Sequence, residues 1–225
     1  MATIPSRLRE PNENWLRRWE ENNIGWHHVA FNQHLLNHWH ALFLPAGSLV
    51  FAPLCGKSRD LFWLAEQGYR IRGIELSRLA VETFFSEHHL QPTVQAVGEF
   101  ERWSQGPYEI YCGDIFDLGQ LDNRDVDAVY DRASLVALNP QQREQFARML
   151  IETMPEGVKI LLVTLEYPQD EMEGPPYSVR EKEVRALFES RFSISLLHTL
   201  DLLRDTDRYG DRGVSQMLEK IYLLK

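Results

Sequence analysis

The chain has 225 residues, of which 44% are hydrophobic and 25% are charged, so it has the composition of a globular protein with a well-buried core. Its formal net charge of -9, without runs of Lys or Arg, argues against nucleic-acid binding, which needs a positive face, and favours a small-molecule partner. Two cysteines make no disulfide framework, the first residues lack a signal-peptide core, and no apolar run reaches the roughly 20 residues of a membrane span, so we expect a cytoplasmic protein.

The chain begins with two expected helices, at 13–22, where Trp15 and Trp19 share one face, and at 30–43. Apolar strands then alternate with helices. The expected strands of this part are 48–53, 69–76 and 158–167, and the segments 108–116 and 126–135 each indicate a strand followed by a loop. The expected helices are 59–68, 77–89 (capped by Ser77), 140–155 and 180–190.

Two last strands, at 192–203 and 215–225, flank a polar turn at 204–214 and have no helix between them, so we expect an antiparallel pair. Together the pattern predicts an α/β fold with a doubly wound, mostly parallel sheet of seven strands and an antiparallel C-terminal hairpin. We expect one domain, 1–225, in which residues 1–45 form a helical cover over the crevice at the carboxyl ends of the strands. No long unpaired apolar surface is evident, which favours a monomer.

The stretch "VFAPLCGKSRDLFWLAEQGYRIRGIELS", residues 50 to 77, resembles a nucleotide site at both ends. Gly56-Lys57-Ser58 matches the end of a phosphate-binding loop, but the first glycine of that motif would fall at Phe51. A dinucleotide site needs three glycines here and the stretch has one, so a pyrophosphate has no cradle.

A glycine still follows the first strand of this stretch and an acid still ends the second strand. These two features suit a ligand that carries a ribose and no phosphates, such as S-adenosylmethionine (SAM). Its amino-acid part would lie over the backbone of Leu54 to Gly56, and its ribose hydroxyls would bond to Glu75 at the end of the second strand. A solvated acid at a strand end is the alternative for Glu75.

Two further strands end in polar residues. Asp114 would accept the adenine amino group with Ile115 against the ring, or would instead close an Asx-turn. The charges of Asp131 and Arg132 form either an internal ion pair or a ligand contact at the carboxyl end of their strand.

Seven segments occur in the order and spacing of the thiopurine S-methyltransferase family, which the chain resembles from about Trp15 to its C-terminus. They are "RRWEENNIGWHH", "APLCGKSRDLFWLAEQG", "GIELS", "GDIFDL", "YDRASLVAL", "LEYPQDEMEGPPYSV" and "EVRALF". The resemblance implies a SAM-dependent transferase with the class I methyltransferase (Rossmann-like) fold. It implies SAM contacts at Trp19, Leu54, Glu75 and Arg132, with Asp114 and Ile115 near adenine.

One position departs from the family pattern, which usually reads Ile-Gly-Phe-His-Gln where this chain has Ile24-Gly25-Trp26-His27-His28. The resemblance implies that this aromatic lines the acceptor pocket, so Trp26 is the expected substrate-binding residue. Trp26 is larger than Phe and adds an N–H donor, which predicts a different acceptor preference.

Other residues carry weaker signals. His34 and His38 have a spacing that can bind zinc, but no third ligand is evident, so no metal is expected. Cys55 has no visible base partner and is expected to be a small buried residue.

The sequence therefore predicts an S-methyltransferase for a small aromatic or heterocyclic thiol, with selenium or tellurium species as further acceptors. It assigns no catalytic residue. Two alternatives remain. One is methyl transfer to oxygen or nitrogen, with His27 or Asp131 as the base, and the other is a non-catalytic SAM-binding module.

Overall fold

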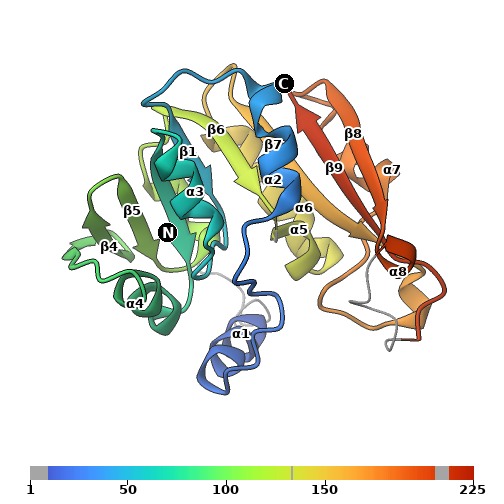
Figure 1. The fold of residues 1–225 in the computed structure, drawn as a ribbon, viewed down its shortest axis with the longest axis horizontal. Coiled ribbons are helices and arrows are strands. Elements are labelled where there is room, and N and C mark those ends of the chain that lie inside the picture. Colours follow the sequence, from blue (N-terminus) through green and yellow to red (C-terminus); the bar gives the residue numbers. More distant parts are fainter. Residues whose placement is uncertain (1–9, 133, 206–212) are drawn as a thin grey trace.

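Nine strands form one mixed sheet in the computed structural model, which describes residues 10–132, 134–205 and 213–225 (Figure 1). In chain order the strands are β1 (Leu49–Ala52), β2 (Arg70–Glu75), β3 (Thr93–Val97), β4 (Phe100–Gln105), β5 (Tyr108–Cys112), β6 (Val126–Asp131), β7 (Lys159–Glu166), β8 (Ile194–Asp201) and β9 (Leu218–Leu224). Their order across the sheet is β3-β4-β5-β2-β1-β6-β7-β9-β8. The strands β5, β2, β1, β6 and β7 are parallel, so their carboxyl ends meet at one edge.

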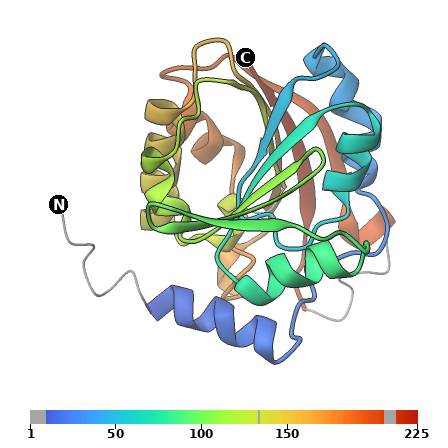
Figure 2. The same cartoon turned by 90° about the vertical axis from the view of Figure 1, so that its left-hand side faces the viewer.

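Helices cover both faces of this sheet (Figure 2). The α-helices are α1 (Glu10–Glu20), α2 (Gln33–His38), α3 (Asp60–Glu66), α4 (Arg78–Ser86), α5 (Ser134–Ala137), α6 (Pro140–Thr153), α7 (Glu181–Phe188) and α8 (Leu202–Asp205). The 3-10 helices are η2 (Trp39–Leu42), η3 (Ile115–Gln120) and η4 (Gln169–Glu171). Within the ranges that the structure describes, none of these helices is long and apolar enough to cross a membrane.

Burial on both faces explains the nearly continuous apolar runs of β1 and β7. All four residues of β1 are buried. On one face, side chains of the central strands pack with α2, α3 and α4 through residues such as Leu35, Leu64 and Phe84. On the other face they pack with α6 and α7 through residues such as Phe146 and Phe188. The fold class is therefore confirmed, and the C-terminal strands pair antiparallel as predicted, with β9 lying between β7 and β8.

The sheet has two strands more than the seven that the sequence predicts. The hairpin of β3 and β4 pairs antiparallel with β5 and extends that edge. Four of the five residues of β3 are exposed, so the sequence of this strand has no buried apolar run by which it could be predicted. The helix expected at 30–43 is also divided into α2 and η2 and ends where Phe43 takes a left-handed backbone conformation with φ of 48°. Most of the polar turn expected at 204–214 lies outside the described residues.

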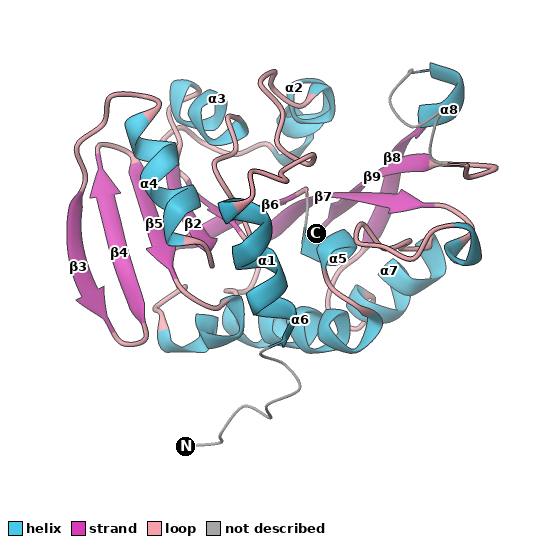
Figure 3. Cartoon of the chain, turned by 90° about the horizontal axis from the view of Figure 1, so that it is seen from below, coloured by secondary structure: helices cyan, strands magenta, loops and turns pink. Residues whose placement is uncertain are grey.

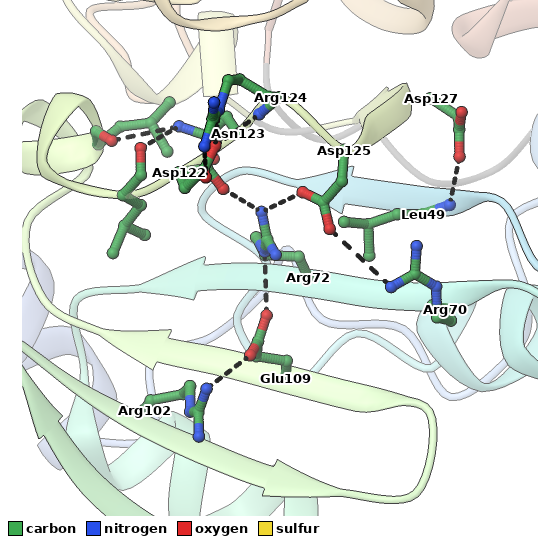
Figure 4. A network of polar contacts seen from close by, with 12 residues as sticks. Leu49, Arg70, Arg72, Arg102, Glu109, Asp122, Asn123, Arg124, Asp125 and Asp127 are labelled. Carbon is green, nitrogen blue, oxygen red and sulfur yellow. Dashed lines mark hydrogen bonds and ion pairs between the residues drawn. The ribbon is translucent and has the colours of Figure 1, made fainter.

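A network of ion pairs ties β2 to its surroundings away from the apolar core (Figure 4). Arg72 of β2 donates to Glu109 of β5 at 3.0 Å, to Asp125 at 3.1 Å and to the backbone carbonyl of Asp122 at 2.8 Å. Arg102 of β4 bonds to the second oxygen of Glu109. The Arg72 side chain is only 10% exposed, so removing it leaves carboxylates in a partly desolvated setting without their partner.

We expect Arg72→Met to lower the free energy of unfolding by about 2–3 kcal/mol, somewhat less than the cost of breaking a fully buried ion pair because Asp125 is half exposed. Arg124→Met is the control, since the Arg124 side chain is 89% exposed and its pair with Asp122 lies in water. Urea denaturation measures both variants. Equal midpoints for the two variants would contradict the assigned role of Arg72.

Candidate functional site

A cavity of about 260 Å³ lies at the carboxyl edge of the parallel strands, close to the lower end of the range of about 300–1,000 Å³ for small-molecule sites. Its wall includes all eight of the site residues that the sequence predicts. They are Trp19, Trp26, Leu54, Gly56, Glu75, Asp114, Ile115 and Arg132. Helix α1 crosses this edge of the sheet and contributes Asn12, Trp15, Arg18 and Trp19 to the wall (Figure 3). Helix α2 packs on a sheet face instead, and none of its residues lies on the cavity wall.

The Glu75 carboxylate is the buried polar group at the centre of this edge, with a residue exposure of 6%. One oxygen accepts the Gly56 N–H at 2.8 Å and the other accepts the Ser77 N–H at 2.8 Å. Burial raises its pKa to about 7, although the backbone donors of Ser77, Gly56 and Leu76 act in the opposite direction. Glu75 is therefore a buried acid rather than a solvated one, and it titrates near neutral pH.

The turn after β1 has the shape that the single glycine requires. Leu54 and Gly56 both have positive φ, at 46° and 53°, and a Cβ built on Gly56 would lie 3.2 Å from the Trp19 ring. Leu54 is strained in this conformation because it is not glycine, and strained backbone of this kind is found most often at ligand sites. The Cys55 N–H donates to the Ile74 carbonyl, which fixes the turn against the end of β2.

Asp114 follows β5 and uses both carboxylate oxygens within the protein. One oxygen accepts the Phe116 N–H and caps η3, as in the Asx-turn alternative. The other accepts the side-chain amide of Asn12, from α1, at 2.7 Å. Ile115 lies beside it on the cavity wall. The acid is therefore part of the wall and is also the point at which α1 is attached.

Arg132 follows β6 and pairs with Asp60, at 3.2 Å between Nε and a carboxylate oxygen. The same oxygen accepts the Tyr130 hydroxyl at 2.9 Å, and the other oxygen accepts the backbone N–H of Asn32 at 2.8 Å. Asp60 is 2% exposed and holds β6, α3 and the segment before α2 together. The ion pair considered from the sequence is thus present, with Asp60 as the partner of Arg132.

Three tryptophans form an aromatic wall on the side of α1. The Trp26 ring meets Trp15 and Trp19 edge-on, with ring centroids 5.1 and 5.9 Å apart. The Arg18 guanidinium lies 5.0 Å from the centroid of Trp26 and 5.2 Å from that of Trp15. These contacts hold Trp26 in the same cavity as the residues expected to bind SAM.

His27 lies beside this wall in a positively charged region. Burial, and after it the charge of Lys57, lowers the pKa of His27, and Arg132 and Arg59 act in the same direction while Glu87 opposes them. The imidazole is therefore neutral at pH 7. Asp131, the other base considered from the sequence, does not line the cavity. Successive side chains at the end of β6 alternate in direction, so Asp131 points to the opposite side from Arg132. Asp131 is 1% exposed, and its carboxylate accepts the Ser134 N–H.

Two weaker signals of the sequence have structural explanations. His34 donates or accepts at Glu219, and His34 and His38 stack with ring centroids 6.2 Å apart. In the part of the chain that the structure describes, no group of three or more His, Cys, Asp or Glu side chains is placed to hold a metal ion. Cys55 is buried against Gly73, and burial raises the pKa of its thiol well above the ordinary value, so it is not an activated nucleophile.

Three residues at or beside the site were not identified from the sequence: Asn12, Asp60 and Glu219. Asn12 and Asp60 act through partners 102 and 72 positions away, and no local pattern reports such a contact. Glu219 could have been found from the sequence. It alternates with Ile221 and Leu223, so it is an acid on the inward face of a buried strand, which is an unusual position for a charge.

The family model for thiopurine S-methyltransferase matches residues 10–225. The chain is 46% identical to thiopurine S-methyltransferase of Nitrosospira multiformis over 213 residues, which are 94% of this chain and 96% of that protein. It is also 46% identical to thiopurine S-methyltransferase of Pseudomonas entomophila over 210 residues, which are 93% of this chain and 97% of that protein.

Solved structures share the fold at low sequence identity. The chain aligns with 1,6-didemethyltoxoflavin-N1-methyltransferase of Burkholderia thailandensis, solved with its acceptor and S-adenosylhomocysteine. The TM-score is 0.65 at 12% identity, over 100% of this chain and 92% of that one. It also aligns with phosphoethanolamine N-methyltransferase 2 of Haemonchus contortus, with a TM-score of 0.61 at 9% identity, over 85% of this chain and 52% of that one.

The contact between Gly56 and Trp19 gives a direct test of the site geometry. We expect Gly56→Ala to cost about 2 kcal/mol of stability, from left-handed backbone strain plus displacement of the Trp19 ring. Gly106→Ala is the matched control, because Gly106 has nearly the same φ of 56° and nothing within 4 Å of its added Cβ, so only the strain of about 1 kcal/mol applies. Denaturant midpoints measure the difference, and equal losses would show that Trp19 does not pack over Gly56.

Proposed function

This chain belongs to the thiopurine S-methyltransferase family of SAM-dependent enzymes, and we propose that it methylates the sulfur of a small aromatic or heterocyclic thiol, with selenium or tellurium species as further acceptors. The chain is a methyltransferase and SAM is its methyl donor. The acceptor class, the roles of individual residues and the helical cover are the parts that we propose.

In this proposal SAM binds at the end of the cavity formed by β5, β2 and β1. The buried Glu75 carboxylate is an acceptor for two ribose hydroxyls, and the turn from Leu54 to Gly56 lets the backbone approach the amino-acid part. We assign Asp114 and Ile115 to the adenine, and Trp19 and Arg132 to the remaining SAM contacts. When bound, SAM supplies a methyl group activated by the adjacent positive sulfur.

The positive region around His27 is the observation that carries the thiol assignment. Burial is the largest cause of the lowered pKa of His27, and the charges of Lys57, Arg132 and Arg59 act in the same direction while Glu87 opposes them. The three cations disfavour a further positive charge and favour a negative one. A thiol that enters this region ionises more readily, and the thiolate is the nucleophilic form. His27 with a lowered pKa is a weak base, so the site favours an acceptor that ionises without help.

Trp26 completes the acceptor side of the cavity in this proposal. Its ring is held by Trp15 and Trp19 and presents a flat apolar surface to a planar acceptor. The family usually has phenylalanine here, so the larger ring narrows the space available to the acceptor.

We further propose that α1 is the helical cover of the cavity, within a single domain that acts as a monomer; of the segment 1–45 expected to form the cover, α2 packs on a sheet face instead. The bond between Asn12 and Asp114 supports the cover, because it places α1 across the cavity. The net charge of -9 disfavours nucleic acid as a partner.

Transfer of a labelled methyl group from SAM to a panel of thiols, phenols and amines tests the acceptor class. Phenols and amines need a positioned base, which contributes about 10²–10⁴-fold, so we expect them to react slower than aromatic thiols by that factor. Two aromatic thiols of similar shape, with pKa values about two units apart, should give pH profiles whose rising limbs differ by the same interval. Equal rates for phenols, or one common rising limb for both thiols, would refute the assignment.

The raised pKa of Glu75 predicts a pH-dependent affinity for the donor. Ribose hydroxyls donate to the ionised carboxylate, which dominates above pH 7 and is lost as the pH falls through the folded-state value of about 7. We expect binding of 5′-methylthioadenosine, which carries the ribose and no titrating amino group, to be about tenfold weaker at pH 6 than at pH 8. Calorimetry at the two pH values gives the ratio.

Glu75→Gln is the control, because it removes the titration and leaves a side chain of the same size. We expect the affinity of this variant to be independent of pH and below that of the unmodified protein at pH 8 by about 1.5–3 kcal/mol. A variant that keeps the pH dependence would show that another group is responsible.

A further inference from the structure

Glu219 is the third acidic residue on the described part of the cavity wall, after Glu75 and Asp114. Glu75 ends β2 and Asp114 follows β5, whereas Glu219 lies on β9, on the other side of β1, β6 and β7. Four strand spacings of about 4.8 Å separate β2 from β9, or about 19 Å. A donor held by Glu75 and Asp114 therefore leaves Glu219 to the acceptor.

His34 holds the Glu219 carboxylate in place. Its Nε2 lies 2.6 Å from one carboxylate oxygen, and the two side chains are 7% and 15% exposed. The His34 ring is itself fixed, because it stacks on His38 and lies 5.9 Å from His198 of β8. The Asn32 side chain caps the N-terminus of α2, the helix that carries His34. This arrangement fixes the orientation of the acid before any ligand binds.

The second oxygen of Glu219 remains available as an acceptor. Among the residues that the structure describes, His34 is the hydrogen-bond partner of the side chain, and it engages one oxygen only. An ionised carboxylate has about four lone-pair positions, so most of its hydrogen-bonding capacity is unused. A largely buried carboxylate with unused hydrogen-bonding capacity, on the wall of a ligand cavity, is a recognition element for a donor group.

The cross-strand neighbours of Glu219 in the sheet are apolar. Leu165 and Leu200 lie opposite it on the two neighbouring strands. Val163, Leu165, Pro175 and Pro176 line the same cavity. Of the other polar groups on this wall, the Tyr130 hydroxyl donates to Asp60 and the side-chain oxygen of Gln142 accepts the Asn139 N–H. Thr164 of β7 also lines the cavity. A planar ring in this part of the cavity would therefore meet the Glu219 carboxylate on a mostly apolar wall.

We propose that Glu219, oriented by His34, is a specificity-determining residue that accepts a hydrogen bond from a ring N–H of the acceptor. This inference rests on the proposed thiol S-methylation. The positive region near Arg132 and His27 favours the anionic sulfur, and Glu219 favours a donor edge on the same ring. The two preferences together select a heterocycle with a thiol at one edge and an N–H at another, and they discriminate against carbocyclic thiols of the same size.

Two bicyclic acceptors test the proposal: 6-mercaptopurine, which carries ring N–H groups, and 2-naphthalenethiol, which carries none. The measured quantity is the ratio of their kcat/KM values, in which differences common to both acceptors cancel. We expect Glu219→Leu to lower kcat/KM for 6-mercaptopurine about 10–100-fold, mainly through KM, the loss that follows from removing a hydrogen bond to a charged group. The value for 2-naphthalenethiol should stay within about twofold.

His34→Phe separates orientation from direct contact, because phenylalanine keeps a ring against His38 and His198 and removes Nε2. We expect a smaller loss, about 3–10-fold, for 6-mercaptopurine only. In the double variant the loss should equal that of Glu219→Leu alone, since His34 acts through Glu219. Glu166→Leu is the matched control: Glu166 lies on β7, pairs with Lys220 at 2.8 Å and does not line the cavity.

Calorimetry with S-adenosylhomocysteine checks that the donor end is intact in every variant, and we expect unchanged affinity. An equal loss for both acceptors, an unchanged ratio, or additive losses in the double variant would overturn the proposal while leaving thiol methylation in place. If Glu219→Leu does not fold, Glu219→Gln tests the same ratio with the shape preserved. Absence of transfer to both thiols by the unmodified protein would overturn the proposed function itself, and this inference with it.

Discussion

The buried carboxylate of Glu75 is the constraint around which the site is arranged. It accepts backbone N–H groups from the turn after β1 and from the start of α4, so two connections that diverge in the chain meet at one acid. Each of these N–H groups would otherwise be a buried donor without a partner, which costs about 1–3 kcal/mol. The carboxylate therefore fixes the turn that contains Gly56. Because Gly56 has no side chain, the Trp19 ring packs over it, and this contact holds α1 over the sheet edge.

The order of the strands divides this edge into two regions of different chemistry. The part formed by β5, β2 and β1 offers carboxylates and exposed backbone, which suits the hydroxyls and amino groups of a nucleoside. The part formed by β6, β7 and β9 offers apolar residues, the Arg132 cation after β6 and one further acid, Glu219. Because parallel strands end side by side, both regions open into one cavity. In the proposed function this arrangement places donor and acceptor next to each other without a flexible connection.

Charged groups on the wall are held by partners outside it. Asp60 orients Arg132, Glu87 pairs with Lys57 at 2.7 Å, and His34 orients Glu219. Each pairing fixes a side chain before a ligand arrives, so little conformational entropy remains to be lost on binding. Preorganised charges are also more effective than mobile ones, because they need not reorient as the reaction proceeds.

The sequence by itself determined the features that depend on local geometry. The alternation of apolar strands and helices follows from residue periodicity, so the fold class was predictable. The positions of Gly56, Glu75 and Asp114 on the wall follow from where strands end, whereas Trp19 and Trp26 were expected only from the resemblance to the family. The β3–β4 hairpin was not, because its outer strand is exposed and carries no buried pattern. Only the tertiary structure decided which side chains meet: Asn12 with Asp114, Asp60 with Arg132, and His34 with Glu219. These partners are between 72 and 185 positions apart, and their contact depends on strand order and helix placement, whereas a local pattern reports only backbone conformation and burial.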